Sequence, residues 1–171
     1  MSYGILLLRL VVGVAFVGHG TQKLFGWFGG YGPEGTGGFF ASKGYRAPVL
    51  MAVAAGLAEA GGGTLLALGF ATPLAAALLA TVMINAIASV TLKKGFMLGS
   101  EIEITYLTIA VSLAAIGPGR FSIDRAIGWD DDLSGVWCGV AALGAALVVS
   151  FLTLTLGRTR PVGDQESAAE T

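Results

Sequence analysis

Long apolar stretches separated by short polar breaks dominate the hydrophobic pattern of this chain. The stretches are rich in Leu and Ala and lack the alternation of a strand, which predicts helices. A helix needs about 20 mainly apolar residues to cross a bilayer. Five windows qualify: Gly4–Phe25, Pro48–Gly69, Pro73–Leu92, Glu101–Gly117 and Leu133–Leu156. The pattern predicts an all-α polytopic membrane protein, with an antiparallel four-helix transmembrane bundle and a fifth C-terminal transmembrane helix.

The breaks between these windows carry clear turn signals. In "GFATP", residues 69–73, glycine suits the end of one helix and proline the first turn of the next. This tight turn makes the second and third helices antiparallel neighbours. "KKGFMLGS" separates the third and fourth helices, and "IGPGRFS" ends the fourth. The connection Gly26–Ala47 is rich in glycine and aromatic residues, which predicts a loop at the membrane interface that folds partly back over the bundle.

Composition supports a lipid environment and excludes several classes of function. Of 171 residues, 54% are hydrophobic and only 12% are charged, against roughly 25% charged in soluble domains. The net charge of −1 argues against nucleic acid as a partner. The single cysteine, Cys138, forms no internal disulfide, and the sequence holds no haem, flavin or metal motif. Redox chemistry would therefore need an external cofactor, such as a quinone, or a partner protein.

The distribution of basic residues predicts the orientation. The N-terminal stretch lacks the features of a cleaved signal peptide and is expected to be a retained membrane helix. Two basic residues, Arg120 and Arg125, lie on the side of the N-terminus. The other side has six: Lys43, Arg46, Lys93, Lys94, Arg158 and Arg160. The positive-inside rule then places the N-terminus outside and the C-terminus in the cytoplasm. Residues 157–171 are expected to be a disordered cytoplasmic tail.

Ionisable residues inside the spans are the candidates for function, because charge is costly within a bilayer. The first helix carries Arg9, His19 and Lys23 on one face, and Glu59 lies near the middle of the second. Counting residues along each helix from its cytoplasmic end places most of these groups, together with Asn85 of the third helix, in the cytoplasmic half of the bundle. The expectation is a polar pocket, without a metal, built by His19, Lys23, Glu59, Asn85 and one of two further candidates, Glu101 or Glu103.

Charge balance suggests how these groups pair, and several plainer roles stay open. Lys23 is expected to meet Glu101 or Glu103, and Glu59 to meet His19 or Arg9. Arg9 belongs to the opposite leaflet and is predicted to be an anchor that snorkels outward. Lys23 and the two helix-four glutamates could equally be ordinary interfacial charges, and Asn85 could form an interhelical hydrogen bond.

Small residues predict close helix packing. Gly56 and Ala60 form a small-xxx-small pair on the second helix. Gly135 and Gly139 form a GxxxG pair on the fifth, either a docking face for another helix or a contact in a homo-oligomer.

With these residues assembled, the chain resembles the DoxX family of small bacterial membrane proteins. The resemblance runs from about Leu8 to Asp124. It rests on "RLVVGVAFVGHGTQKLFGWFGG", "EGTGGFFASKG", Glu59 in a Gly/Ala-rich helix, "KKGF" followed by "EIEITYL", and "GPGRFSID". The sequence departs from the family pattern at "MLGSEIEI", so either Glu101 or Glu103 could match the family's acidic residue.

The resemblance implies a bacterial cytoplasmic-membrane location and a four-helix membrane domain over residues 1–125. Residues 126–156 are then an added acidic loop and transmembrane helix, followed by the tail. Members are associated with membrane oxidoreductase assemblies, and a related subunit serves thiosulfate:quinone oxidation. No catalytic signature transfers; the recurring polar positions are His19, Lys23, Glu59 and Glu103. We consider three functions: a membrane subunit of a redox complex whose pocket takes a quinone-like head group, a small proton-coupled transporter, and a non-catalytic scaffold or assembly factor.

Overall fold

The structure, a computed structural model, describes residues 2–92 and 95–159. Within these ranges the chain is all-α, with seven α-helices: α1 (Ser2–Phe25), α2 (Gly32–Ser42), α3 (Pro48–Leu68), α4 (Thr72–Ala86), α5 (Glu101–Ile116), α6 (Ile123–Ala126) and α7 (Val136–Thr155). Four helices are long and apolar enough to cross a membrane: Ser2–Phe25, Pro48–Leu68, Thr72–Thr91 and Val136–Thr155. The predicted polytopic membrane protein is confirmed at this level.

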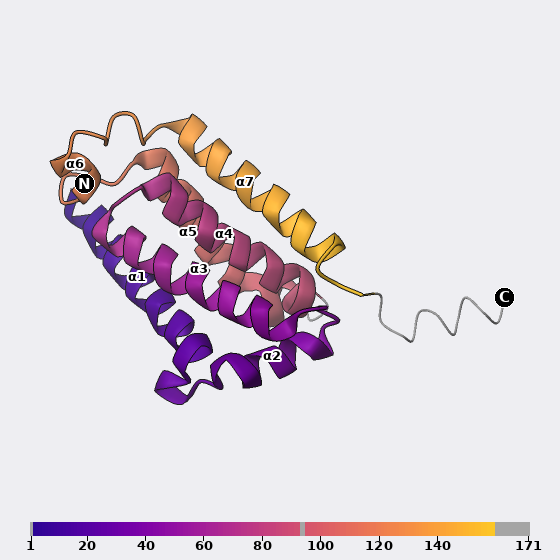
Figure 1. Ribbon diagram of the computed structural model, residues 1–171. Helices are drawn as coiled ribbons and strands as arrows, with labels where there is room; N and C mark the ends of the chain where they lie inside the picture. The colour runs from indigo at the N-terminus through magenta and orange to yellow at the C-terminus, as the bar shows by residue number, and fades with distance from the viewer. Residues whose placement is uncertain (1, 93–94, 160–171) are drawn as a thin grey trace, which may run out of the picture.

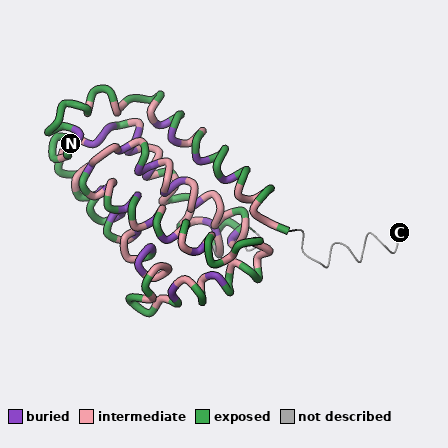
Figure 2. The backbone as a smooth tube through the Cα atoms, viewed as in Figure 1, coloured by how far each residue is buried: buried purple, intermediate pink, exposed green. Residues whose placement is uncertain are grey.

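The five long helices lie side by side and alternate in direction, whereas α2 and α6 cover opposite ends (Figure 1). We call the end at which α1 begins and α6 lies the Arg9 end. The end at which α1 finishes and α2 lies is the Lys23 end. The N-terminus is at the Arg9 end, and α7 finishes at the Lys23 end. Buried positions follow the inner faces of the helices, and the outer faces are exposed (Figure 2).

The predicted turn between α3 and α4 is present. Gly69 ends α3 with φ +63°, a left-handed conformation that glycine adopts without strain. Pro73 stands in the first turn of α4. Two helices extend beyond their regular α-helical part by a π-helical turn, Ile87–Thr91 after α4 and Phe96–Ser100 before α5.

The connection between α1 and α3 contains a helix where the sequence suggested a loop. α2 begins with Pro33 in its first turn and an acidic residue, Glu34, near its N-terminus, both of which favour a helix start. Its glycines allow close packing: a Cβ at Gly37 would lie 2.8 Å from a methyl group of Val49. The glycines of this segment, which indicated a loop, therefore allow α2 to pack closely against α3.

Glycines bring α1 and α3 into close contact along their length. A Cβ on Gly13 would lie 2.6 Å from the carbonyl oxygen of Gly63. Seven residues later, a Cβ on Gly20 would lie 2.6 Å from the carbonyl oxygen of Gly56 and 2.5 Å from the amide nitrogen of Ala60. Helix axes can approach this closely only where side chains are absent, as in other membrane bundles. The small-residue pair predicted at Gly56 and Ala60 does serve packing.

The prediction for Arg9 is wrong: this side chain does not snorkel outward but is 1% exposed. Its guanidinium donates to the carbonyl oxygens of Leu66 and Ala67 at the end of α3. It also donates to the carbonyls of Pro118 and Phe121 in the segment after α5. Four acceptors satisfy the guanidinium inside the protein, and the helix C-terminus is a favourable place for positive charge.

Asp124 makes the complementary contact beside Arg9. Its carboxylate accepts hydrogen bonds from the backbone amides of Ala71 and Thr72 and from the Thr72 hydroxyl, at 2.8–3.1 Å. The two amides lie at the N-terminus of α4, where backbone amides have no partner within the helix. Arg9 and Asp124 therefore cap the two helix ends on either side of the α3–α4 turn.

α7 docks on α4 and α5. Gly139 is buried against α5, where its added Cβ would lie 2.9 Å from the Cβ of Ala115. Of the two roles expected for the Gly135/Gly139 pair, docking within the chain is the one that Gly139 fills. The prediction of a disordered tail is wrong for residues 157–159: Arg158 donates to the carbonyl of Lys43, and the amide and hydroxyl of Thr159 donate to the carbonyl of Gly44. Residues 160–171 lie outside the described residues.

Candidate functional site

The centre of the candidate site is an ion pair between Lys23 of α1 and Glu59 of α3. The Lys23 Nζ lies 2.5 Å from Oε2 of Glu59, whose side chain is 4% exposed. Lys23 comes one turn after Gly20, and Glu59 one turn after Gly56, so the glycine contact between the helices brings the charges together. The predicted partners were different: Lys23 was assigned to Glu101 or Glu103, and Glu59 to His19 or Arg9. Both pairings are wrong.

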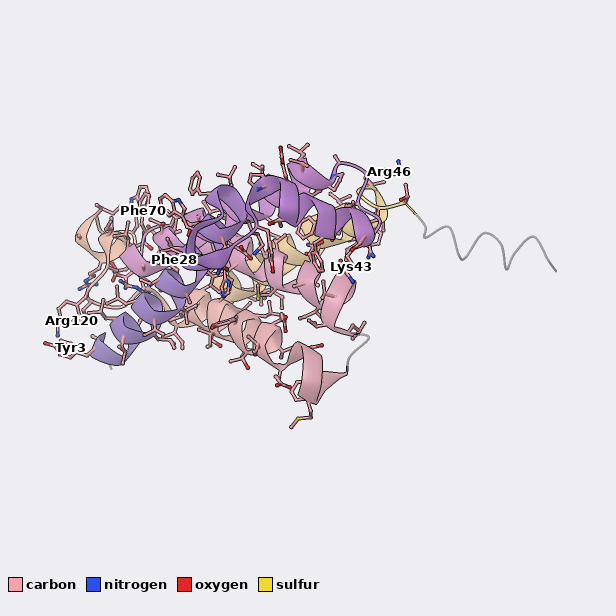
Figure 3. All side chains as sticks on the ribbon, turned by 90° about the horizontal axis from the view of Figure 1, so that it is seen from below. Tyr3, Phe28, Lys43, Arg46, Phe70 and Arg120 are labelled. Atoms are coloured by element: carbon pink, nitrogen blue, oxygen red, sulfur yellow. The ribbon has the colours of Figure 1, made fainter. Side chains whose placement is uncertain are left out.

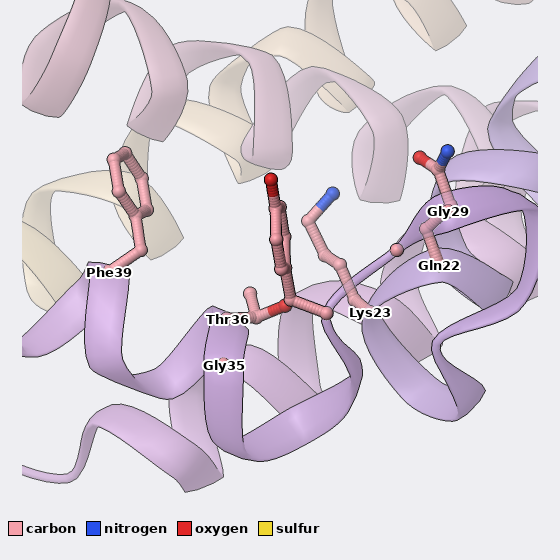
Figure 4. A pocket seen from close by; sticks show the side chains of 8 residues that line it. Gln22, Lys23, Gly29, Gly35, Thr36 and Phe39 are labelled. Carbon is pink, nitrogen blue, oxygen red and sulfur yellow. The ribbon is translucent and has the colours of Figure 1, made fainter.

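A groove lies over this ion pair, with polar side chains set among apolar ones in its lining. Its volume is about 580 Å³, within the range of small-molecule sites. It lies between the end of α1, the 3₁₀ turn Trp27–Gly29 and α2. Figure 4 shows the side chains of Gln22 and Lys23 on α1 and that of Phe39 on α2 around this space. The lining residues are Gln22, Lys23, Gly29, Gly30, Tyr31, Gly35, Thr36 and Phe39.

His19 precedes Lys23 by one helical turn and lies on the outer, exposed side of α1. Its Nδ1 is 3.2 Å from Oε1 of Gln22, and the Gln22 amide donates to the carbonyl of Phe28. Because a glutamine oxygen only accepts, Nδ1 is the donor and Nε2 of a neutral ring keeps its lone pair. His19 is therefore linked to the groove wall through Gln22 but does not line the groove, so its predicted place inside the pocket is wrong.

Helix α5 faces α1 across the bundle. The rings of Phe16 and Tyr106 meet edge to face, with centroids 5.2 Å apart. The two helices run in opposite directions. One helical turn closer to the Lys23 end, His19 on α1 and Glu103 on α5 therefore lie at the same depth along the bundle. One carboxylate oxygen of Glu103 is buried without a hydrogen-bond partner among the described residues, and the same holds for Glu101. Both glutamates thus have a buried oxygen without a partner in the described part of the chain, and the question of which one faces the site stays open.

Asn85 belongs to a separate polar network and not to the site. Its amide nitrogen donates to the hydroxyl of Ser150 on α7, at 3.0 Å, and its oxygen accepts from Thr153 at 2.8 Å. Tyr45, after α2, donates to the same oxygen at 3.5 Å and contacts Ser89 at 2.9 Å. The predicted interhelical hydrogen bond of Asn85 is confirmed. The prediction that Asn85 belongs to the pocket is wrong.

Sequence reasoning missed the groove residues of α2 and the pairing of charges with helix ends. Tyr31 and Thr36 line the groove, yet both come from a segment interpreted as a loop. Arg9 was expected to snorkel outward, and no role was predicted for Asp124. One signal was available in the sequence: Arg9 lies inside an apolar window, which indicates a buried side chain. Pairing of that side chain with backbone carbonyls was not considered.

Fold and site together define a polytopic helical membrane protein with a lysine–glutamate ion pair beneath a groove. The sequence of residues 4–92 matches the DoxX family. A protein of Bacillus subtilis (strain 168) named "Putative oxidoreductase CatD" is 36% identical over 121 residues, which cover 71% of this chain and 84% of that protein. The chain belongs to the DoxX family. No solved structure matches it.

Proposed function

We propose that this chain is a membrane subunit of a redox complex in the bacterial cytoplasmic membrane, and that the groove over Lys23 and Glu59 takes the head group of a quinone. The relative named as an oxidoreductase supports the redox assignment. The observation that carries the ligand assignment is the pair of charged groups held beneath an open groove between α1 and α2.

Five membrane crossings are part of this proposal, with α5 as the fifth membrane helix. α4 runs from the Arg9 end to the Lys23 end, and α7 starts again at the Arg9 end. The chain must return between them, and α5 is the helix that does so. The hydroxyls of Thr105 and Thr108 on its exposed face donate to carbonyls four residues earlier, which leaves them satisfied in lipid.

The same proposal places the Lys23 end in the cytoplasm. Lys43, Arg46 and Arg158 lie at that end (Figure 3 labels the first two). The Arg9 end has Arg120 and Arg125 but also the acidic run 130–132. The positive-inside rule favours this orientation. The division into a domain of residues 1–125 and an added helix α7 completes the proposed organisation.

The chemistry of a quinone suits the donors that line the groove. A quinone carbonyl is an acceptor, and the ammonium of Lys23 and the hydroxyls of Tyr31 and Thr36 are donors. Reduction to the hydroquinone takes two electrons and two protons. In this proposal an electron-carrying partner protein supplies the electrons. The Lys23–Glu59 pair and His19 pass the protons to the two oxygens and recover them from water at the Lys23 end.

Binding of decylubiquinone to the purified protein in detergent tests the proposal. We expect saturable quenching of the intrinsic tryptophan fluorescence, because Trp27 lies in the 3₁₀ turn at the groove. Lys23→Met removes the donor and should weaken binding about tenfold, the equivalent of one charge-assisted hydrogen bond. Arg46→Gln is the matched control, since Arg46 is an exposed cation at the same end that does not line the groove.

Equal quenching in wild type, Lys23→Met and Arg46→Gln would contradict the quinone site. If the protein binds no quinone and instead moves protons across proteoliposome membranes in response to a solute gradient, the transporter hypothesis takes its place. If it does neither, the scaffold hypothesis is favoured.

A further inference from the structure

Another pocket lies at the Arg9 end, far along the bundle from Lys23. Its volume is about 390 Å³. It lies among the beginnings of α1 and α7, the end of α5, and α6. The lining residues are Ser2, Ile116, Gly117, Pro118, Gly119, Arg120, Arg125, Asp130, Asp131 and Ser134.

The walls of this pocket are held by contacts from inside the protein. Arg9 binds the carbonyl of Pro118 from within the bundle. The amide of Gly135 donates to the carbonyl of Ala115 at 3.0 Å, which fixes the start of α7 against the end of α5. Ser134 packs against Gly117, where an added Cβ would lie 2.8 Å from the serine Cβ. A ligand would therefore meet a preformed pocket and would not have to order its walls.

The pocket presents both signs of charge. Arg125 donates to Asp130 at 2.6 Å. This hydrogen bond, with the charges of Asp130 and Asp131, raises the pKa of Arg125 above its ordinary value. Arg120 and Asp131 also line the pocket, and neither is in an ion pair with another described residue. One cation and one carboxylate are thus left to meet a ligand.

The pocket opens beside an exposed apolar surface. Ile116 is 64% exposed, Val136 65% and Trp137 78%. Tryptophan is enriched at the level of lipid head groups. A molecule with a polar head in the pocket would therefore place an apolar portion along the ends of α5 and α7.

We infer that this pocket binds the head group of a zwitterionic phospholipid with a primary amine, phosphatidylethanolamine. The phosphate oxygens accept hydrogen bonds from the guanidinium of Arg120, which suits phosphate geometry. The ammonium donates to the carboxylate of Asp131. A lipid with a negative head group alone would leave Asp131 unpaired, and a quaternary ammonium has no N–H to donate.

Lipid retention in native mass spectrometry tests this inference. The full chain is reconstituted in nanodiscs that contain equal amounts of phosphatidylethanolamine, phosphatidylglycerol and phosphatidylcholine of matched acyl chains, and the retained lipids are counted after release. We expect one phosphatidylethanolamine to be retained about tenfold over either other lipid, which corresponds to one charge-assisted hydrogen bond. Arg120→Gln and Asp131→Asn should each abolish this preference. Arg46→Gln, an exposed charge at the other end, should preserve it.

Other outcomes overturn the inference. Equal retention of phosphatidylglycerol would show that the pocket recognises the phosphate and not the amine. Retention that is unchanged in both pocket variants would place the lipid elsewhere. Displacement of the lipid by millimolar free phosphoethanolamine, with equal affinity for that compound in lipid-free detergent, would assign the pocket to a soluble zwitterion. Circular dichroism of each variant confirms that its helical content matches wild type.

Discussion

Lys23 and Glu59 form an ion pair of 2.5 Å between α1 and α3, directly beyond the contact of Gly20 with Gly56. Lys23 is 24% exposed at the groove, and Glu59 is 4% exposed behind it. The lysine therefore shields the carboxylate, and a ligand in the groove meets the lysine first. In the proposed site Lys23 would therefore contact the ligand, and Glu59 would hold the lysine ammonium in place.

Removing one member of this pair should cost more stability than removing both. Lys23→Met leaves a buried carboxylate unpaired, and loss of one partner of a buried pair typically costs about 3–5 kcal/mol. The double variant Lys23→Met with Glu59→Leu should recover most of that loss. Thermal unfolding in detergent measures the stability of Lys23→Met, Glu59→Leu and the double variant. Additive losses in the double variant would show that the two side chains do not interact in solution.

Arg9 should be essential for the fold at its end of the bundle. Arg9→Met removes the donors to four carbonyl oxygens, and hydrogen bonds to charged groups contribute about 1.5–3 kcal/mol each. We expect a loss of at least about 3 kcal/mol in the free energy of unfolding. Arg9→Lys should recover little, because one ammonium does not reproduce the planar fork. A stable Arg9→Met protein would contradict the role of Arg9 as a helix cap.

Two neighbouring glycines of α1 provide a matched test of the contact with α3. Gly20→Ala places a methyl group 2.5 Å from the amide nitrogen of Ala60, so the helices must separate, at a typical cost of about 1–3 kcal/mol. Gly18→Ala meets no atom within 4 Å and should leave stability unchanged or higher. Equal unfolding temperatures for the two variants would argue against the close helix contact.

The number of crossings is testable with single cysteines in a Cys138→Ser background. Arg46 lies after one helix of the bundle, and Asp131 lies after three more. If α5 crosses the membrane, Asp131→Cys reacts with an impermeant maleimide on intact cells, and Arg46→Cys reacts only in inverted vesicles. Reaction of both from the same side would mean that α5 does not cross. The background protein without cysteine controls for nonspecific labelling.

The apolar pattern predicted the long helices because length and hydropathy decide them, and Gly69 and Pro73 predicted the α3–α4 turn because they suit helix ends. It did not predict α2, because the glycines of that segment are as frequent in loops as in close helix contacts. Whether Gly37 packs on Val49 depends on tertiary approach, which no local pattern contains.

The sequence also identified Lys23, His19 and Glu59 as a group but not how they pair. The position of a residue along its helix gives the depth of its charge in the bundle. Which charges pair depends on how each helix is rotated about its axis and on the distance between the helices. Glu59 could meet Lys23 because glycines bring α1 close to α3, and α5 has no such contact with α1 at that level. Arg9 was misjudged because its partners are backbone carbonyls, which carry no signature in the sequence.

The most direct test of the central claim is where a quinone binds. A photoreactive azidoquinone is crosslinked to the purified protein, and the modified peptides are identified by mass spectrometry. We predict modification within residues 22–39, which include the groove lining, with competition by decylubiquinone and a marked decrease in Lys23→Met. Modification confined to the outer faces of α5 and α7, or unchanged by Lys23→Met and by the competitor, would contradict a quinone site over Lys23 and Glu59.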